Sequence, residues 1–274
     1  MPVLRFAFFG QHVAVACDGR EPAELLGTVY GAFASSDGVE PEAPVLDYSV
    51  ARGPDGELLI RRRCEELARA DESGSFLYAF EHDLTVEVQK RRRDLYFLHA
   101  AALEREGRAV LLVAESGAGK STTAWALLHH GFRYASDELA PIELSSGRVH
   151  GFPHALCLKS DPPAPYALPG GVLRTSRARH VPVELLPCGL ARCPLPQDAI
   201  VFLRYRADRH QPAIRPVGAA EATARLYVQA LNPLAHPGDG LDAALEVVRG
   251  GRCFGLEAAG LAATCDLLVR TLFP

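Results

Sequence analysis

A glycine-rich segment between an apolar run and a helix-forming stretch carries the clearest chemical signal in the chain. Residues 108–123 read RAVLLVAESGAGKSTT. Small residues let successive backbone N–H groups turn toward an anion, and the positive end of a helix that starts near Gly119 attracts phosphate oxygens. The pattern predicts a phosphate-binding loop, with Lys120 on its surface reaching the β- and γ-phosphates and the Ser121 hydroxyl ligating Mg²⁺. The residues expected to contact the nucleotide are Ser116, Gly117, Ala118, Gly119, Lys120, Ser121 and Thr122.

One position departs from the usual G-x-x-x-x-G-K-[ST] pattern, because Ala114 stands where the first glycine is expected. Alanine fits there only if the turn avoids positive φ. The alternative interpretation of the segment is a glycine-bearing turn between a strand and a helix, with a chance Lys-Ser pair.

Two acids end the next expected strand. Asp137 lies 17 residues after Lys120, and Glu138 is its neighbour. In a parallel arrangement, Asp137 would lie beside the loop, where it can hold Mg²⁺ or take a proton from an attacking hydroxyl. Glu138 alternates to the other face of a regular strand, yet at a strand end it can still reach the ion. The alternative is that both acids cap the following turn.

His99 lies 21 residues before Lys120, in the apolar stretch LHAAAL. A histidine there is either a satisfied core residue or a catalytic group, and its chemistry alone does not choose between the two.

The combined segment 99–142, HAAALEREGRAVLLVAESGAGKSTTAWALLHHGFRYASDELAPI, resembles the core of the HPr kinase/phosphorylase family, with weaker similarity at 151–159 and 199–205. The family's loop and fold are similar to those of phosphoenolpyruvate carboxykinase. The resemblance implies ATP and Mg²⁺ binding and phosphorylation of a hydroxyl, usually that of serine. It also implies that Asp137 is the base and His99 its electrostatic partner.

Several features differ from that family. The acid pair is Asp-Glu instead of Asp-Asp, no glycine- and arginine-rich C-terminal signature is found, and the first 94 residues do not resemble the family's regulatory domain. The chain is therefore most similar to divergent HPr-kinase-related proteins, including kinases of ribosomally made peptides such as lasso-peptide precursors. Its expected acceptor is a peptide or protein other than HPr.

Two basic features follow the acid pair. The resemblance implies that Lys159 lies near the nucleotide, against the alternative of a surface lysine. Arg174, Arg177, Arg179 and His180 form a basic patch in a proline-rich segment, 160–198, that either grips an acidic acceptor or is a solvated loop. Composition does not decide whether that segment is a lid, a substrate loop or a rigid structural wrap.

The first 94 residues are expected to form a small α+β accessory domain. Alternation around Gly10-Gln11 predicts a hairpin over 1–17. Apolar residues at helical spacing predict a helix from Pro22 and a long helix over 77–88, closed by the Lys90–Arg93 cluster, and short strands are expected at 46–51 and 58–62. The cluster is either a solvated helix end or a site for an acidic partner. Residues 34–44 are expected to form a loop.

Residues 95–274 are expected to form the α/β kinase domain, a P-loop core of the HPr kinase/phosphoenolpyruvate carboxykinase type. Helices are predicted at 123–130, with Gly131 as C-cap, and at 219–231, 241–249 and 261–272. Strands are predicted at 132–138, 140–144, 199–205 and 253–256.

Composition limits the class of protein. The net charge of −4 argues against a general nucleic-acid or anionic-membrane binder. No apolar run approaches the roughly 20 residues that span a bilayer, and the first residues lack the features of a signal peptide. Seven scattered cysteines are expected as buried or half-buried thiols in a reducing compartment. These features predict a cytoplasmic protein and leave its oligomeric state open, a homo-oligomer included.

The sequence thus predicts a Mg·ATP-dependent kinase that acts on a serine-type hydroxyl of a peptide or protein. Two rival functions are a small-molecule kinase with the same site and a non-catalytic nucleotide-sensing protein. The acid pair argues against the second, because nucleotide binding alone needs no base.

Overall fold

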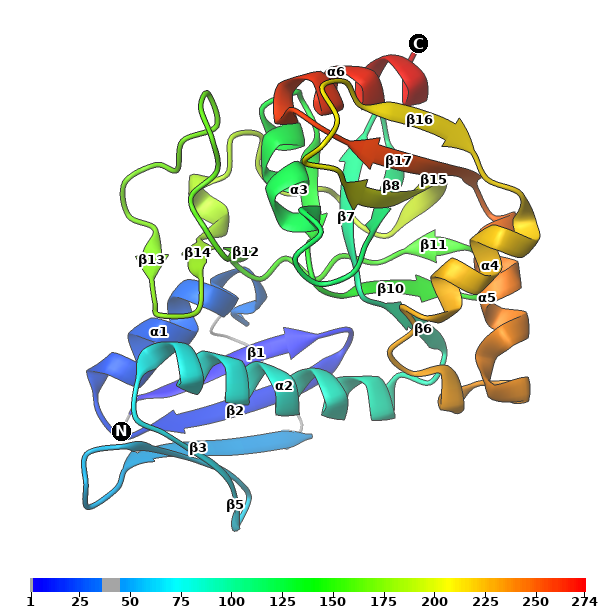
Figure 1. The fold of residues 1–274 in the computed structure, drawn as a ribbon. Coiled ribbons are helices and arrows are strands. Elements are labelled where there is room, and N and C mark those ends of the chain that lie inside the picture. Colours follow the sequence, from blue (N-terminus) through cyan, green and yellow to red (C-terminus); the bar gives the residue numbers. More distant parts are fainter. Residues whose placement is uncertain (1, 36–44) are drawn as a thin grey trace.

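The N-terminal part of the chain folds as a five-stranded sheet covered by two helices (Figure 1). The computed structural model describes residues 2–35 and 45–274. The strands follow the order of the sequence across the sheet, and only the β2–β3 pair is parallel, because α1 returns the chain between them. The elements are β1 (Val3–Phe8), β2 (Gln11–Cys17), α1 (Arg20–Tyr30), η1 (Gly31–Phe33), β3 (Leu46–Arg52), β4 (Leu58–Arg62), β5 (Glu65–Ala70) and α2 (Ser73–Arg91). The predicted hairpin, helices and two strands are confirmed; the predicted loop at 34–44 lies largely outside the described residues.

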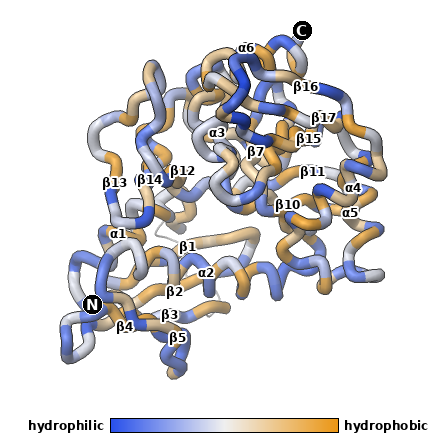
Figure 2. Tube along the Cα trace, viewed as in Figure 1, coloured by the Kyte–Doolittle hydropathy of each residue, from blue (hydrophilic) through white to orange (hydrophobic). Residues whose placement is uncertain are grey.

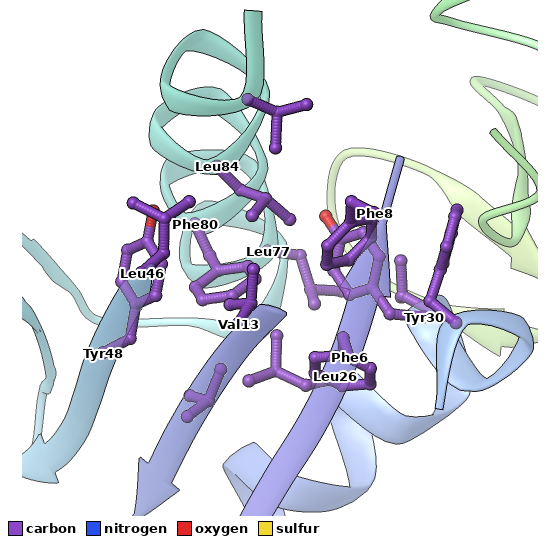
Figure 3. Close-up of a cluster of buried hydrophobic side chains, with 14 of the residues drawn as sticks. Phe6, Phe8, Val13, Leu26, Tyr30, Leu46, Tyr48, Leu77, Phe80 and Leu84 are labelled. Carbon is purple, nitrogen blue, oxygen red and sulfur yellow. The ribbon is translucent and has the colours of Figure 1, made fainter. Parts of the chain in front are cut away.

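Both helices pack on one face of this sheet. Leu46 and Tyr48 of β3 point toward Leu77 and Phe80 of α2, as period-two and helical spacing require (Figure 3). Val50, two residues further along β3, is buried in the same cluster. The buried cluster continues beyond the sheet, into residues of the later chain: Leu95, Phe97, Leu139, Phe152 and Ala155. The N-terminal sheet therefore shares its core with the segments that follow it.

A nine-stranded mixed sheet forms the larger part of the molecule, and β15 joins its two halves. The first residues of β15 pair with β11 and its remainder pairs in parallel with β8 and β17. The path runs β6-β10-β11-β15-β8-β7-β9, with β17 and β16 branching from β15. The bounds are β6 (Leu95–Leu98), β7 (Ala100–Arg105), β8 (Arg108–Val113), β9 (Arg133–Ser136), β10 (Ala140–Glu143), β11 (Arg148–Val149), β15 (Leu195–Tyr205), β16 (Ala213–Pro216) and β17 (Arg252–Ala258).

Helices cover both faces of the central strands, so this part has three layers (Figure 1). Val110 and Leu112 of β8 face α3 and α6, while Leu111 and Val113 face α4 and α5. Figure 2 shows hydrophobic colours along the central strands, as expected for strands buried on both faces. The helices are α3 (Lys120–Leu128), α4 (Ala219–Tyr227), η3 (Pro233–Ala235), η4 (Pro237–Gly240), α5 (Leu241–Arg249) and α6 (Leu261–Leu272).

The proline-rich segment is partly ordered into a small sheet of its own. The strands β12 (Leu156–Leu158), β14 (Arg179–Val181) and β13 (Leu173–Arg174) pair in that order, and η2 (Val183–Leu185) follows them. Thr175 and Ser176, which connect β13 to β14, approach the start of α2, where the Ser176 hydroxyl donates to Glu72. The segment thus lies against the N-terminal sheet and helices.

Several predicted boundaries change. Helix α3 ends at Leu128 instead of His130, although Gly131 has the positive φ of +84° expected after a helix. Helix α4 ends at Tyr227, four residues early, and β15 begins four residues before the expected Ala199. Cys64 and Cys188 are exposed, contrary to the expectation of buried or half-buried thiols. Across residues 2–35 and 45–274, each helix is either too short or too polar to cross a bilayer.

Candidate active site at one edge of the large sheet

Three strands bring the predicted site residues to one edge of the large sheet. Strand β7 lies between β8 and β9 and is antiparallel to both, so β8 and β9 run in the same direction. Ala100, the first residue of β7, pairs with Val113, the last residue of β8, and Ala102 pairs with Ser136 at the end of β9. The edge therefore collects His99, the loop after Val113 and the acids after Ser136. The two like-directed strands are not neighbours, because β7 separates them.

The loop backbone requires glycine at two positions. Gly117 has φ of +85° and Gly119, the N-cap of α3, has φ of +94°, a region that residues with a Cβ rarely adopt. Ala114 has no positive φ, which removes the conflict raised by its replacement of glycine. Among the described residues, no side chain caps the N-terminus of α3. The first-turn N–H groups therefore have neither an intrahelical nor a capping partner, the arrangement that binds anions at helix ends.

Lys120 is buried, which corrects the prediction of an exposed loop lysine. It is the first residue of α3 and only 5% exposed. Its ammonium donates to the backbone carbonyl of Asp137 and lies 3.7 Å from Glu138 Oε2. The reason is geometric: a side chain in the first turn points back toward the helix N-terminus, which here faces the end of β9.

Asp137 is fully buried and only half satisfied. Its Oδ2 accepts a hydrogen bond from the backbone N–H of Cys157 at 3.1 Å. Its Oδ1 has no hydrogen-bond partner in the described part of the chain. Burial, and next the charge of Glu138, raise the pKa of Asp137 above its usual range. The carboxylate thus presents one free oxygen with increased basicity.

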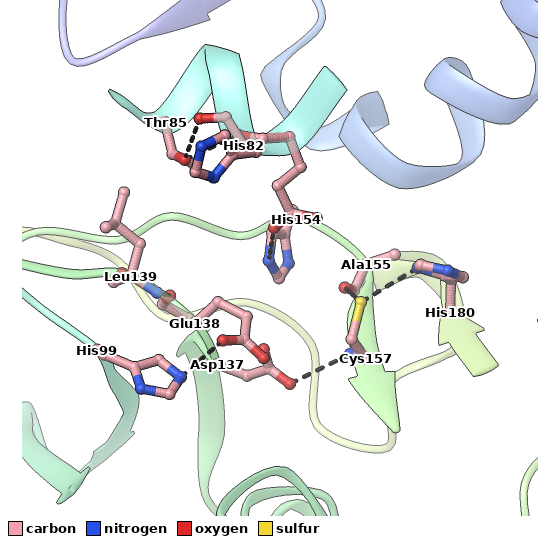
Figure 4. Close-up of polar contacts among 12 residues, drawn as sticks. His82, Thr85, His99, Asp137, Glu138, Leu139, His154, Ala155, Cys157 and His180 are labelled. Atoms are coloured by element: carbon pink, nitrogen blue, oxygen red, sulfur yellow. Dashed lines mark hydrogen bonds and ion pairs between the residues drawn. The ribbon is translucent and has the colours of Figure 1, made fainter. Parts of the chain in front are cut away.

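The Glu138 carboxylate lies between His99 and Lys120 and contacts both. Its Oε2 lies 3.0 Å from His99 Nε2. Burial alone would raise the pKa of Glu138, but the His99 hydrogen bond and the charge of Lys120 outweigh it and hold the pKa below its usual range. His99 is fixed from the other side by Gln229, whose carbonyl accepts the His99 N–H at 2.9 Å and whose Oε1 lies 3.3 Å from His99 Nδ1. The direct partner of His99 is therefore Glu138 and not the expected Asp137 (Figure 4).

Lys159 reaches the glycine-rich loop, one residue after β12 ends. Its ammonium donates to the Ser116 hydroxyl at 2.8 Å. Ser121 and Thr122 occupy the second and third positions of α3 and are half-buried. The residues predicted to contact the nucleotide, 116–122 and Lys159, thus lie together in the structure.

The structure offers few ligands for a metal ion. Within the described residues, no group of three or more His, Cys, Asp and Glu side chains has metal-binding geometry. The predicted set of Ser121, Asp137 and Glu138 contains only two acids, and Glu138 Oε2 is already engaged. The free Asp137 Oδ1 and the Ser121 hydroxyl remain as oxygen donors of the kind that Mg²⁺ prefers.

The expected basic patch is occupied by internal contacts. Arg174 forms a two-armed pair with Asp161, Arg179 approaches the same carboxylate at 3.5 Å, and the guanidinium of Arg177 lies over the Tyr78 ring. His180 is buried against Cys157, and burial lowers its pKa to about 4. These residues hold the proline-rich segment together, so the structure favours the interpretation as a rigid wrap over a free carboxylate grip.

Sequence reasoning missed Gln229, which lies 130 residues from His99 and had no signal of its own. The sequence assigned no role to His154 either. This histidine is fully buried, and its Nε2 lies 3.2 Å from Glu81 Oε1 on α2. Burial alone would lower the pKa of His154, but the carboxylate of Glu81, with smaller effects from Asp137 and Glu138, raises it to about 9.

This pair predicts a pH dependence of stability. The folded pKa of His154 exceeds its unfolded value, so the pair's contribution is complete below about pH 6.5 and is lost as pH rises through about 9. The shift corresponds to about 3 kcal/mol. We expect the difference in melting temperature between the parent and His154→Gln to shrink across this range. If the difference in melting temperature stays constant across this range, His154 contributes packing alone. The control is His82→Gln, the same substitution at an exposed histidine of α2.

Comparison with solved structures gives a distant match to a kinase. No protein-family model and no curated protein matches the chain. Among solved structures, the Hpr(Ser) kinase/phosphatase from Coxiella burnetii aligns with 64% of this chain and 92% of its own at 14% identity, with a TM-score of 0.32. Both the sequence identity and the TM-score of this match are low.

Proposed function

We propose that this chain is a Mg·ATP-dependent phosphotransferase that moves the γ-phosphate of ATP to a serine-type hydroxyl of a peptide or protein. The observation that carries the proposal is the fully buried Asp137, whose free oxygen lies at the same sheet edge as the glycine-rich loop and Lys120. An anion-binding loop explains nucleotide binding, and a buried base beside it is needed only for transfer.

In this proposal, the N–H groups of residues 116, 117 and 119–121 hold the phosphate oxygens, while the Ala118 N–H donates to the Glu115 carbonyl within the loop. Lys120 adds a positive charge at the helix N-terminus. Lys159 closes the loop from the far side through Ser116. Glu138 keeps Lys120 and His99 in place, because its Oε2 contacts both. These groups position the nucleotide before any bond changes.

Ser121 and the free Asp137 Oδ1 would hold Mg²⁺, which when bound neutralises charge on the phosphate oxygens. The acceptor oxygen forms a bond to the γ-phosphorus, the bond from that phosphorus to the bridging oxygen breaks, and ADP leaves. The hydroxyl proton passes to the Asp137 carboxylate, which lies fully buried at the same sheet edge as the loop.

The peptide or protein acceptor rests on the resemblance of residues 99–142 to the HPr kinase/phosphorylase family. The rival acceptors are small hydroxyl compounds, and a competition assay separates them. Serine-containing peptides are expected to accept label from γ-labelled ATP, whereas free serine and sugars neither accept it nor compete.

Binding of the nucleotide is tested by calorimetric titration. We expect saturable Mg·ATP binding that weakens at least about tenfold when the metal is chelated, since the loop then faces the full phosphate charge. Equal affinity for ATP with and without Mg²⁺ would show that the site does not bind the metal together with the nucleotide. Binding without transfer to any hydroxyl would favour the nucleotide-sensing alternative.

A further inference from the structure

Residues 152–157, here called the linking segment, run between the N-terminal helices and the acid pair. On the side of the large sheet, the Phe152 N–H donates to the Ala135 carbonyl at 2.9 Å and the Cys157 N–H donates to Asp137 Oδ2 at 3.1 Å. The segment therefore provides the hydrogen bond that fixes the orientation of the Asp137 carboxylate.

The same segment is held by the N-terminal part of the chain. The Ala155 N–H donates to the carbonyl of Val29, the penultimate residue of α1, at 2.8 Å, and His154 pairs with Glu81 of α2 at 3.2 Å. The Phe152 ring lies among aromatic rings of the N-terminal part: Phe8, Phe9 and Phe33, with centroids 5.0–6.0 Å away. Phe152, His154 and Ala155 thus contact the N-terminal elements, and Cys157 at the end of the segment contacts Asp137.

Figure 4 shows His154 between α2 and the acids, with its ring directed toward Glu138 and Asp137. The titratable groups that face it are Glu81 from α2, Tyr134 from β9, the acid pair itself and His180 from β14. The Tyr134 hydroxyl lies 3.5 Å from His154 Nδ1. Among the described residues, Glu81 is the only carboxylate in direct contact with the His154 ring.

We propose that Glu81 and His154 are positioning residues through which the N-terminal sheet and helices hold Asp137 in its working orientation. The proposal rests on the proposed function, since it assigns the N-terminal part a role in phosphoryl transfer instead of a separate accessory one. Glu81 fixes His154, His154 fixes the linking segment, and the Cys157 N–H at its end fixes the carboxylate.

The test variant is Glu81→Gln, because it keeps the side-chain shape and removes the charge that pairs with His154. The matched control is His82→Gln, at the next residue of the same helix, which is exposed and stacks on the Tyr78 ring. Melting temperatures of both variants establish that they are folded.

The first readout is amide hydrogen exchange, which needs no turnover. In Glu81→Gln we expect exchange at residues 152–157 to quicken by about tenfold or more, the Cys157 amide included, with the control unchanged. Unchanged exchange at Cys157 would overturn the link between Glu81 and Asp137, even if the parent transfers no phosphate and the proposed function itself fails.

The second readout is kinetic. A misplaced base lowers kcat by about tenfold or more, while KM for Mg·ATP stays within about threefold, because the loop is not moved. The same substitution in an Asp137→Asn background should lower the rate no further, since the residue acts through Asp137. A parental kcat for Glu81→Gln, or an equal loss in both backgrounds, would contradict the positioning role.

Discussion

Asp137→Asn is expected to lower phosphoryl transfer by at least about 10²-fold, the lower end of what a positioned base contributes. The substitution keeps the shape of the side chain and the acceptor for the Cys157 N–H, if the amide oxygen takes the place of Oδ2. It removes both the base and a charged metal donor. Steady-state transfer from γ-labelled ATP measures the loss, and a thermal melt shows that the fold remains.

Asp242→Asn serves as the matched control, because Asp242 is an exposed acid on α5, which packs on the face of the sheet opposite α3. It should transfer phosphate at the parental rate. If Asp137→Asn also does so, the buried carboxylate is a structural group and the acid pair caps the turn.

Lys120→Met is expected to weaken Mg·ATP binding at least about tenfold and to lower transfer by about 10²-fold or more, because the charge nearest the phosphates is removed. Methionine is preferable to alanine, since Lys120 is buried and a shorter side chain would leave a cavity. The lost contact with the Asp137 carbonyl is expected to lower stability by about 1–3 kcal/mol. Calorimetry, activity and denaturant unfolding separate the three effects.

Lys90→Met is the control, because Lys90 is 63% exposed at the end of α2 and pairs with Glu87 of the same helix. Both substitutions change the net charge equally. If Lys120→Met binds Mg·ATP with the parental affinity, the glycine-rich segment is a turn between a strand and a helix that does not bind phosphate.

Local patterns predicted the parts of the fold that local chemistry determines. The apolar run before the loop, the glycines and the helix after it are contiguous, so β8, the loop and α3 were expected with nearly the right bounds. Strands β6 and β7 were missed because both are buried on two faces and therefore show no alternation. Strand β5 was missed for the opposite reason, since its exposed, charged sequence resembles a loop.

Long-range contacts account for what the sequence did not predict at the site. Lys120 is buried because the end of β9 supplies an acceptor, which no pattern around the loop reveals. Helix α4 ends early because residues after Tyr227 turn to pair with β6 and to hold His99. Arg174, Arg177 and Arg179 were expected either to grip an acceptor or to be solvated, and Asp161 and Tyr78 engage all three.

The central claim is that this sheet edge transfers phosphate, and label transfer from γ-labelled Mg·ATP to a library of serine-containing peptides tests it most directly. The parent should place label on serine, and Asp137→Asn should reduce that label by about 10²-fold while still binding nucleotide. Nucleotide binding with no label on any peptide or small hydroxyl compound in the parent would contradict the account.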